Sequence, residues 1–185
     1  EAKRLIDFVR PLHQGDEQSF NRDIGKYLDL DQFSRYLAVN TFVANMDSLF
    51  MTGHNFYLYL DPRTDKFVFI PWDLDLAFAG FAFMSTPEQQ VDLSIVHPHI
   101  GENKLLDRLM ANAEIRQSYL KTFRELAGTV LAKDKLLAQI DAVEKAKTDG
   151  AVVLAGGNRL VDEAHKNGFY ISATLLENVS ASDEI

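Results

Sequence analysis

The chain has 185 residues, of which 46% are hydrophobic and 25% charged, and a formal net charge of −8. This length favours a single domain over residues 1–185, and the acidic balance excludes nucleic-acid binding through a general excess of Lys and Arg. The absence of cysteine excludes disulfides, thiolate metal sites and a Cys nucleophile. No run of roughly 20 apolar residues predicts a membrane span, so we expect a soluble globular protein.

The first 27 residues are expected to form two short helices, over residues 1–9 and 16–27. Pro11 and Gly15 lie between them, and both residue types interrupt helical propagation. The chain begins in an amphipathic pattern without an initiator Met, which suggests that it is part of a longer protein. A targeting segment would then lie outside this chain, and the cellular compartment stays open.

A longer helix is expected next, over residues 31–45. Apolar side chains recur there at spacings of three to four positions from Phe33 to Val43, which is the period of a buried helix. Asp29 or Asp31 is placed to cap its N-terminus.

Two aromatic and β-branched runs follow, at residues 54–60 and 66–70. The segment 61–65 between them is rich in turn formers, so the pattern predicts a β-hairpin. Aromatic clusters in strands are more often packed than bound to a nucleotide base, so core packing is expected for four side chains. These are Phe56, Tyr57, Tyr59 and Trp72.

The remainder is expected to be one long loop followed by helices. Residues 79–101 contain prolines and glycines, and irregular segments of this length are often substrate-side loops or lids. Four segments with helical patterns follow, at residues 103–110, 113–126, 133–148 and 158–167, and glycines separate the last three of them from one another. The predicted fold class is α+β and mainly helical, with a catalytic core over about residues 31–110 and a helical C-terminal part over about residues 111–185.

Two acids follow the second predicted strand directly, at Asp73 and Asp75, among large apolar residues. Carboxylates in such surroundings need partners, because burying an unpaired charge is costly. Upstream, Asp47 follows the predicted long helix and Asn55 opens the first strand. In kinases an Asp in a loop after a helix accepts the proton of the attacking hydroxyl, while an Asn and a strand-ending Asp hold the metal. The order of these residues is therefore that of a phosphoryl-transfer site.

The spacing nevertheless excludes a conventional protein kinase. Asn55 follows Asp47 by eight positions, more than in the usual catalytic-loop motif. No His-Arg pair precedes Asp47, and no Phe-Gly pair follows Asp73. Oxygen ligands of this kind suit Mg²⁺, which is held by one or two carboxylates and completed by phosphates and water.

Three motifs lie between residues 53 and 75. They are Gly-His-Asn-Phe-Tyr-Leu-Tyr at residues 53–59, Asp-Pro-Arg-Thr at 61–64 and Ile-Pro-Trp-Asp-Leu-Asp at 70–75. In them the chain resembles the CotH (spore coat protein H) family, over roughly residues 6–140. The resemblance implies the C-terminal lobe of an atypical protein-kinase-like fold, with the hairpin carrying the metal site. It also implies ATP-dependent phosphorylation of a protein Ser or Thr hydroxyl, with Mg²⁺ or Mn²⁺ and with coat or cell-surface proteins as substrates. A spore coat, cell-surface or secreted location would fit these substrates.

The same resemblance assigns a role to each acid. It makes Asp47 the catalytic aspartate and Asn55 and Asp73 metal-binding residues, with Asp75 as a second metal-binding acid. Nothing before Asp31 resembles a β-rich lobe with a phosphate-gripping Lys. The N-terminal nucleotide lobe is therefore expected to be missing from this chain, which would bind ATP weakly.

Each of these residues also has a structural interpretation. Asp47 is placed to cap the turn after a helix, and Asn55 to hydrogen-bond the turn before a strand. Asp73 and Asp75 alternate with apolar residues, so in an extended strand both would point to one solvated face.

The histidines are interpreted as packing or loop residues. We assign no metal role to His54, His97 or His99, since His-Pro-His in a loop is weak evidence for a zinc pair. The rival function, from a different class, is a non-catalytic surface, adhesion or coat-assembly module that retains a kinase-like scaffold.

Overall fold

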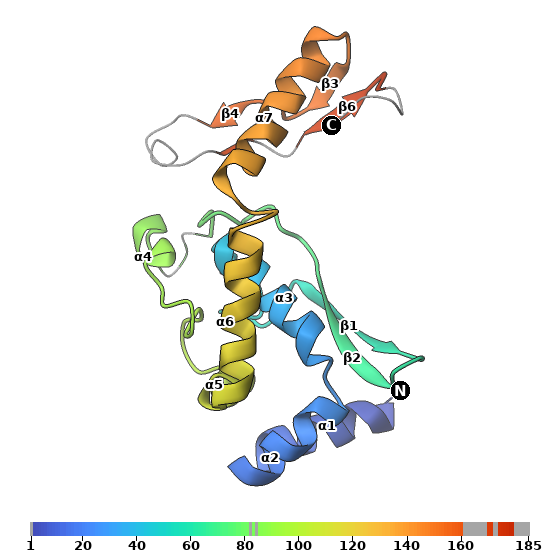
Figure 1. Cartoon of the computed structure of the whole chain (residues 1–185), viewed down its shortest axis with the longest axis vertical. Coiled ribbons are helices and arrows are strands. Elements are labelled where there is room, and N and C mark those ends of the chain that lie inside the picture. Colours follow the sequence, from blue (N-terminus) through green and yellow to red (C-terminus); the bar gives the residue numbers. More distant parts are fainter. Residues whose placement is uncertain (1, 82, 84, 161–169, 172–173, 180–185) are drawn as a thin grey trace. The chain divides into compact units, whose positions relative to one another are not determined.

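The computed structural model describes residues 2–81, 83, 85–160, 170–171 and 174–179. They divide into two compact units, residues 1–125 and 126–185, and each is described by itself. Figure 1 shows helices combined with small sheets, which in the described part are three antiparallel pairs of strands. The α+β class with a predominance of helix is confirmed.

The first helix, α1 (Ala2–Gln14), continues through Pro11, so the predicted interruption at that residue is wrong. Phe8 and Leu12 are buried on either side of Pro11. Their burial holds both halves of the helix on the core, which offsets the hydrogen bond that proline cannot make. The helix ends just before Gly15.

The predicted second helix is divided into α2 (Glu17–Asp23) and the 3₁₀ turn η1 (Ile24–Lys26). Asp16 is the N-cap of α2, and its carboxylate accepts a hydrogen bond of 2.7 Å from the Ser19 N–H. This side chain satisfies an N–H group that has no partner within the helix.

Arg108 on α5 (Lys104–Ala111) ties that helix to α1 and α2. Its guanidinium lies 4.1 Å over the Phe20 ring and 2.9 Å from the Glu17 carboxylate, although Arg108 is only 7% exposed. It donates to four backbone carbonyls, those of Pro11 (2.9 Å), Leu12 (2.8 Å), Gly15 (3.0 Å) and Asp16 (2.8 Å). One buried cation thus satisfies the carbonyls at the end of α1 and in the turn that follows.

The long helix, α3 (Leu30–Phe42), begins at Asp29, which accepts a hydrogen bond from the Gln32 N–H at 3.1 Å. Of the two candidate caps, Asp29 is therefore the one used. The helix ends three residues before the predicted end because Ala44 has a φ of +46°. The Ala44 N–H bonds the Thr41 carbonyl at 3.1 Å and the Asn45 N–H bonds the Asn40 carbonyl at 3.0 Å.

That pair of bonds is a Schellman motif, which usually places glycine at the left-handed position. Here Ala44 occupies it, at a conformational cost of about 1–2 kcal/mol. The motif turns the chain sharply into the loop that leads to Asp47.

The predicted hairpin is confirmed. β1 (Phe56–Asp61) and β2 (Lys66–Pro71) are antiparallel, with Leu58 opposite Phe69. The Asp61 carboxylate accepts the Arg63 N–H at 2.9 Å, and the side-chain hydrogen bonds from Arg63 lower the pKa of Asp61. This local ring is the expected chemistry of an Asp-initiated turn.

One face of the hairpin is built into the core. Phe67 and Phe69 are buried, and their rings lie 5.4 Å from the Phe8 ring and 5.0 Å from the Phe33 ring respectively. Phe56 also packs on Phe69, with ring centroids 5.0 Å apart. Aromatic pairs at these separations stabilise the fold beyond their burial alone.

The opposite face of the hairpin is open. Tyr57, Tyr59 and Trp72 are 56%, 50% and 57% exposed, so the prediction of core packing is wrong for these three residues. Tyr57 and Trp72 do pack on each other across the strands, with ring centroids 5.4 Å apart. The alternation of strand side chains gives the reason, because the even-numbered residues of β1 occupy the core face.

The outer edge of β2 is covered by the segment that leads into α3. The Gln32 side-chain amide donates to the Phe69 carbonyl at 2.6 Å and accepts from the Phe69 N–H at 3.2 Å. The Phe67 N–H donates to the Tyr27 carbonyl at 2.6 Å, and the Phe67 carbonyl accepts from the Asp29 N–H at 3.1 Å. These bonds fix α3 against the hairpin.

The long loop contains a short helix, α4 (Pro87–Val91), which had not been predicted. A capping box forms it, since Thr86 and Gln89 exchange side-chain to backbone hydrogen bonds. The next long helix, α6 (Ala113–Ala127), lies beside α3 (Figure 1). Its buried Tyr119 hydroxyl lies 3.3 Å from Thr41 Oγ1 and donates to the Ile95 carbonyl at 2.7 Å.

The second unit begins at residue 126 and includes the predicted helix α7 (Lys133–Thr148). Strands follow, which corrects the wholly helical C-terminal part. They are β3 (Val152–Ala155) paired with β6 (Leu175–Glu177), and β4 (Arg159–Leu160) paired with β5 (Tyr170–Ile171). The helix predicted over residues 158–167 is wrong at residues 159–160, and residues 161–167 lie outside the described part.

The residue types in the second unit explain this difference. Val152 and Val153 are β-branched and favour strand. Gly156 and Gly157 both have positive φ, at +72° and +73°, so they turn the chain after β3 instead of ending a helix.

Candidate active site

Buried polar side chains hold the loop on either side of Asp47. The Asn45 amide donates to Asn40 Oδ1 at 2.8 Å, and the Ser48 hydroxyl donates to the Asn45 carbonyl at 2.6 Å. All three are at most 1% exposed. The Ser48 carbonyl in turn accepts the Gly53 N–H at 2.9 Å. Sequence reasoning missed this scaffold, although an Asn inside the buried stretch of a helix, as at position 40, is a usable signal.

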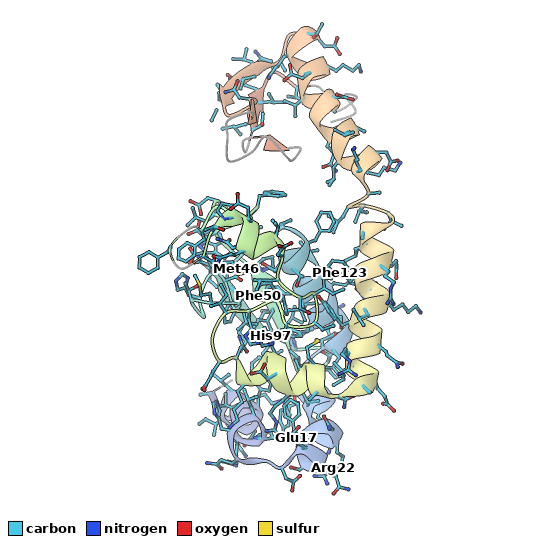
Figure 2. All side chains as sticks on the ribbon, turned by 90° about the vertical axis from the view of Figure 1, so that its left-hand side faces the viewer. Glu17, Arg22, Met46, Phe50, His97 and Phe123 are labelled. Carbon is cyan, nitrogen blue, oxygen red and sulfur yellow. The ribbon has the colours of Figure 1, made fainter. Side chains whose placement is uncertain are left out.

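Apolar anchors reinforce the same loop. Met46 and Phe50 flank Asp47 and Ser48, and each is 1% exposed (Figure 2). Because both anchors are buried, the backbone between them has little freedom.

The structure brings Asp47 and Asn55 into direct contact. The Asn55 amide donates to the Asp47 backbone carbonyl and to Asp47 Oδ2, both at 2.9 Å. Asp47 is only 9% exposed, and Asn55 has a φ of +58°, which Asn tolerates better than most residues. The amide nitrogen is used in these two bonds, and the amide oxygen of Asn55 accepts no hydrogen bond from the described residues.

His54 adds a contact that the sequence did not predict. Its Nε2 lies 3.6 Å from Asp47 Oδ1, and the His54 side chain is 58% exposed. The two carboxylate oxygens of Asp47 therefore face different neighbours, Asn55 on Oδ2 and the exposed imidazole on Oδ1.

Asp73 lies one residue beyond the end of the hairpin pairing. The Trp72 N–H donates to the Asn55 carbonyl at 3.0 Å, which extends the β1–β2 ladder to the residue before Asp73. Asp73 then has a φ of +54° and turns the chain out of the strand. The expectation that Asp73 and Asp75 share one face of an extended strand is therefore wrong.

The chain after Asp75 returns to the end of α3. The Phe78 N–H donates to the Val43 carbonyl at 2.5 Å, and the Ala79 N–H donates to the Ala44 carbonyl at 3.3 Å. Phe78 and Ala79 both have positive φ, at +58° and +60°. Backbone hydrogen bonds therefore hold both ends of the segment 73–77. The bond from Trp72 to Asn55 holds its start, and the bonds to Val43 and Ala44 hold its end.

Backbone strain gathers around these acids. Ala44, Asn55, Asp73, Phe78 and Ala79 all adopt the left-handed region. Such conformations cost of order 1–3 kcal/mol each and occur most often where the geometry serves a function.

Asp73 and Asp75 are exposed. Neither forms an ion pair or a hydrogen bond with the described residues. Within that part of the chain, no trio of His, Asp or Glu that includes either of them has its ligand atoms within 4.8 Å of one another. Oxygen atoms whose lone pairs are not used by protein partners suit Mg²⁺ or Mn²⁺. The metal-binding roles of Asn55, Asp73 and Asp75 stay predictions.

Comparison with known proteins gives the family. The sequence model of the family described as CotH kinase protein matches residues 1–151. The chain belongs to this family. The resemblance seen in the hairpin motifs is thereby confirmed.

A curated relative is similar to the same region. The chain is 26% identical over 143 residues to the inner spore coat protein H of Bacillus subtilis (strain 168), an alignment that covers 75% of this chain and 37% of the relative. The chain therefore spans little more than a third of that relative's length. As regards membranes, no described helix is both long and apolar enough to span one.

Proposed function

We propose that this chain carries the catalytic and metal-binding residues of an ATP-dependent protein phosphotransferase, as the C-terminal lobe of an atypical kinase-like fold. One observation carries the proposal: the Asn55 amide holds the buried Asp47 carboxylate at 2.9 Å, beside the hairpin end that leads into Asp73. Family membership supports it. The chemistry is transfer of the ATP γ-phosphoryl group to a Ser or Thr hydroxyl of a protein.

Asp47 is the group that orients the acceptor hydroxyl and takes its proton. The Asn55 hydrogen bond occupies Oδ2, so Oδ1, which lies 3.6 Å from the exposed His54 imidazole, is the oxygen left to accept the proton of the hydroxyl. The dense packing around the loop fixes the direction of this oxygen before substrate binds, which lowers the entropic cost of reaching the reactive geometry. General-base contributions of this kind amount to about 10²–10⁴-fold in rate.

Asn55, Asp73 and Asp75 would hold Mg²⁺ or Mn²⁺. Such an ion would supply positive charge against the phosphate oxygens during the transfer. The turn at Asp73 supports this role, because it takes an exposed carboxylate out of the strand pairing. The unpaired state of both acids in the described part fits this role, because each carboxylate is free to coordinate.

The decisive test is Asp47→Asn in the natural full-length protein. Phosphate incorporation from ATP into protein, followed by intact-mass spectrometry, is expected to fall by about 10²–10⁴-fold because the amide cannot accept the proton. Asp31→Asn is the matched control, since it removes an exposed carboxylate in the first turn of α3 and is expected to leave the rate unchanged. Equal rates for all three proteins would refute the role of Asp47.

A second candidate function is a non-catalytic binding module, and the open hairpin face favours it. Tyr57 and Trp72 stack edge-to-face with centroids 5.4 Å apart while both stay exposed, and Tyr59 extends the patch. Exposed aromatic surfaces of this kind often mark protein interfaces. The relative named as a coat protein makes coat or cell-surface proteins the proposed partners.

Calorimetry separates the two functions. Heat of binding from ATP with Mg²⁺ on the full-length protein, lost in Asp73→Asn, supports the enzyme. Absence of nucleotide binding, combined with partner binding that Tyr57→Ala abolishes, would support the binding module instead.

A further inference from the structure

Two histidines of the long loop and an aspartate of α5 meet at the start of that helix. His99 Nε2 lies 3.0 Å from Asp107 Oδ1, and His97 Nδ1 lies 3.7 Å from the same oxygen. The two imidazole rings are 4.0 Å apart between centroids (Figure 2 labels His97). All three ligand atoms lie within 4.8 Å of one another.

The surroundings of His99 show what is missing from this cluster. Its side chain is 1% exposed, its Nδ1 lies 3.0 Å from the Gly101 carbonyl, and its Nε2 faces the Asp107 carboxylate. Both partners are acceptors only, whereas a neutral imidazole has a single N–H. Since the ring is buried from water, the second nitrogen requires either an additional proton or a bound cation.

The hydrogen bond to Gly101 is the arrangement that a metal-binding His adopts. A metal-binding His usually donates its second ring N–H to a carbonyl or carboxylate, which fixes the tautomer and directs the other nitrogen at the ion. In His99 the Nδ1–H to carbonyl bond leaves the Nε2 lone pair directed at Asp107, the position that a shared ion would occupy.

The distances fit a small transition-metal ion. Zn²⁺ bonds His nitrogen and carboxylate oxygen at about 2.0–2.2 Å, so tetrahedral ligands lie about 3.4 Å apart. The separations of 3.0 Å and 3.7 Å in this cluster lie on either side of that value. Two imidazoles with one carboxylate suit Zn²⁺ and its neighbours, whereas Mg²⁺ prefers oxygen ligands alone.

We propose that His97, His99 and Asp107 form a binding site for Zn²⁺ or a similar divalent transition-metal ion. His97 and Asp107 are 59% and 47% exposed in their side chains, so the fourth coordination position opens to water. The site is separate from the candidate Mg²⁺ ligands in both residues and ligand chemistry, and it does not depend on phosphoryl transfer.

The loop that bears the site also supports the candidate active site. The Ile100 N–H donates to the Phe50 carbonyl at 3.0 Å, and the Asn103 amide donates to the Leu49 carbonyl at 2.7 Å. Asn103 is also the N-cap of α5. A metal ion that joins His97 and His99 to Asp107 therefore closes a ring between this loop and α5, and braces the turn that follows Asp47.

The test is titration of the apo protein with Zn²⁺, and with Co²⁺ as a spectroscopic probe. We expect one equivalent to bind, with the intense visible bands of four-coordinate Co²⁺, and a rise in Tm of about 5–10 °C at 100 times Kd, reversed by EDTA. Millimolar Mg²⁺ is expected to leave the Co²⁺ spectrum unchanged.

Variants locate the ion. His97→Ala and Asp107→Asn alter exposed side chains and are expected to keep the fold, checked by far-UV CD, while weakening Zn²⁺ binding by more than about 100-fold, beyond the change typical of indirect neighbours. His13→Ala is the control, because this exposed residue at the end of α1 lies outside the cluster, and it should bind as the parent does. Zn²⁺ binding that survives both cluster variants would overturn the proposed site. The absence of any Zn²⁺-dependent rise in Tm would also overturn it, and would mean that a protonated His99 pairs with Asp107 without a metal ion.

Discussion

Replacing Arg108 with alanine is expected to destabilise the N-terminal unit by about 3–5 kcal/mol. The guanidinium donates to the carbonyls of Pro11, Leu12, Gly15 and Asp16 at 2.8–3.0 Å and is 7% exposed. Hydrogen bonds from a charged donor contribute about 1.5–3 kcal/mol each, but burying the cation offsets part of that sum. Water that enters the vacated space would hydrogen-bond some of the carbonyls and reduce the loss further. The expected loss of about 3–5 kcal/mol is the range observed when one partner of a buried charged contact is removed.

The measurement is urea denaturation followed by far-UV CD. In thermal unfolding, a loss of this size corresponds to a Tm lower by about 6–20 °C in a chain of this length. The stability of Arg108→Lys is expected to lie between those of the parent protein and Arg108→Ala, because one ammonium group cannot donate to four carbonyls as a planar guanidinium does. Arg22→Ala is the control, since the exposed Arg22–Asp23 pair contributes little to stability. An Arg108→Ala variant as stable as Arg22→Ala would refute the reasoning.

Three further predictions concern buried polar groups. Within the described residues the Tyr36 hydroxyl is buried without a hydrogen-bond partner, whereas the Tyr119 hydroxyl is hydrogen-bonded. In urea denaturation, Tyr36→Phe should therefore be neutral or stabilising, and Tyr119→Phe should lower the free energy of unfolding by about 0.5–1.5 kcal/mol. The reverse order of stabilities would contradict this prediction. Burial raises the pKa of Tyr119 to about 12 and that of Tyr36 further, so the unfolded chain loses these protons first. The contribution of these two tyrosines to the free energy of unfolding should be constant below about pH 10 and fall above it by about 1.4 kcal/mol per pH unit for each, and the double Phe variant should lose that part of the slope. Asn45→Asp should destabilise more than Asn45→Ala, because a buried carboxylate would face Asn40 Oδ1; equal unfolding midpoints would show that this contact is unimportant.

The parts that could be predicted from the sequence are those with local signals. The hairpin is encoded by its turn, where Asp61 caps the backbone and Asp65 takes a φ of +54°. The contact between Asp47 and Asn55 joins residues eight positions apart, and the family-like motif at residues 53–59 marks Asn55. Sequence order was therefore enough to place these two residues together.

The parts that were missed depend on contacts between distant segments. α3 ends at Phe42 although Ala44 gives no glycine signal, because backbone bonds from Phe78 and Ala79 hold that turn. Arg108, on a helix far along the chain, donates to the carbonyls of Pro11 and Leu12 at the end of α1, and no local sequence pattern predicts these bonds.

The histidine cluster was missed for a different reason, since Asp107 lies only eight positions after His99. A His-Pro-His pair is weak evidence for a metal by itself, and Asp107 is an ordinary acid in the first turn of the next helix. Their spacing alone does not predict the contact between them.

The coverage of β2 by Gln32 decides in which direction this small sheet can be extended. The Gln32 amide occupies the hydrogen-bonding positions of Phe69, and the backbone at Tyr27 and Asp29 occupies those of Phe67. No strand in the described part pairs with the far edge of β1. A β-segment from a neighbouring lobe or another protein must therefore add alongside β1, and it would run past Asn55 at the rim of the candidate active site.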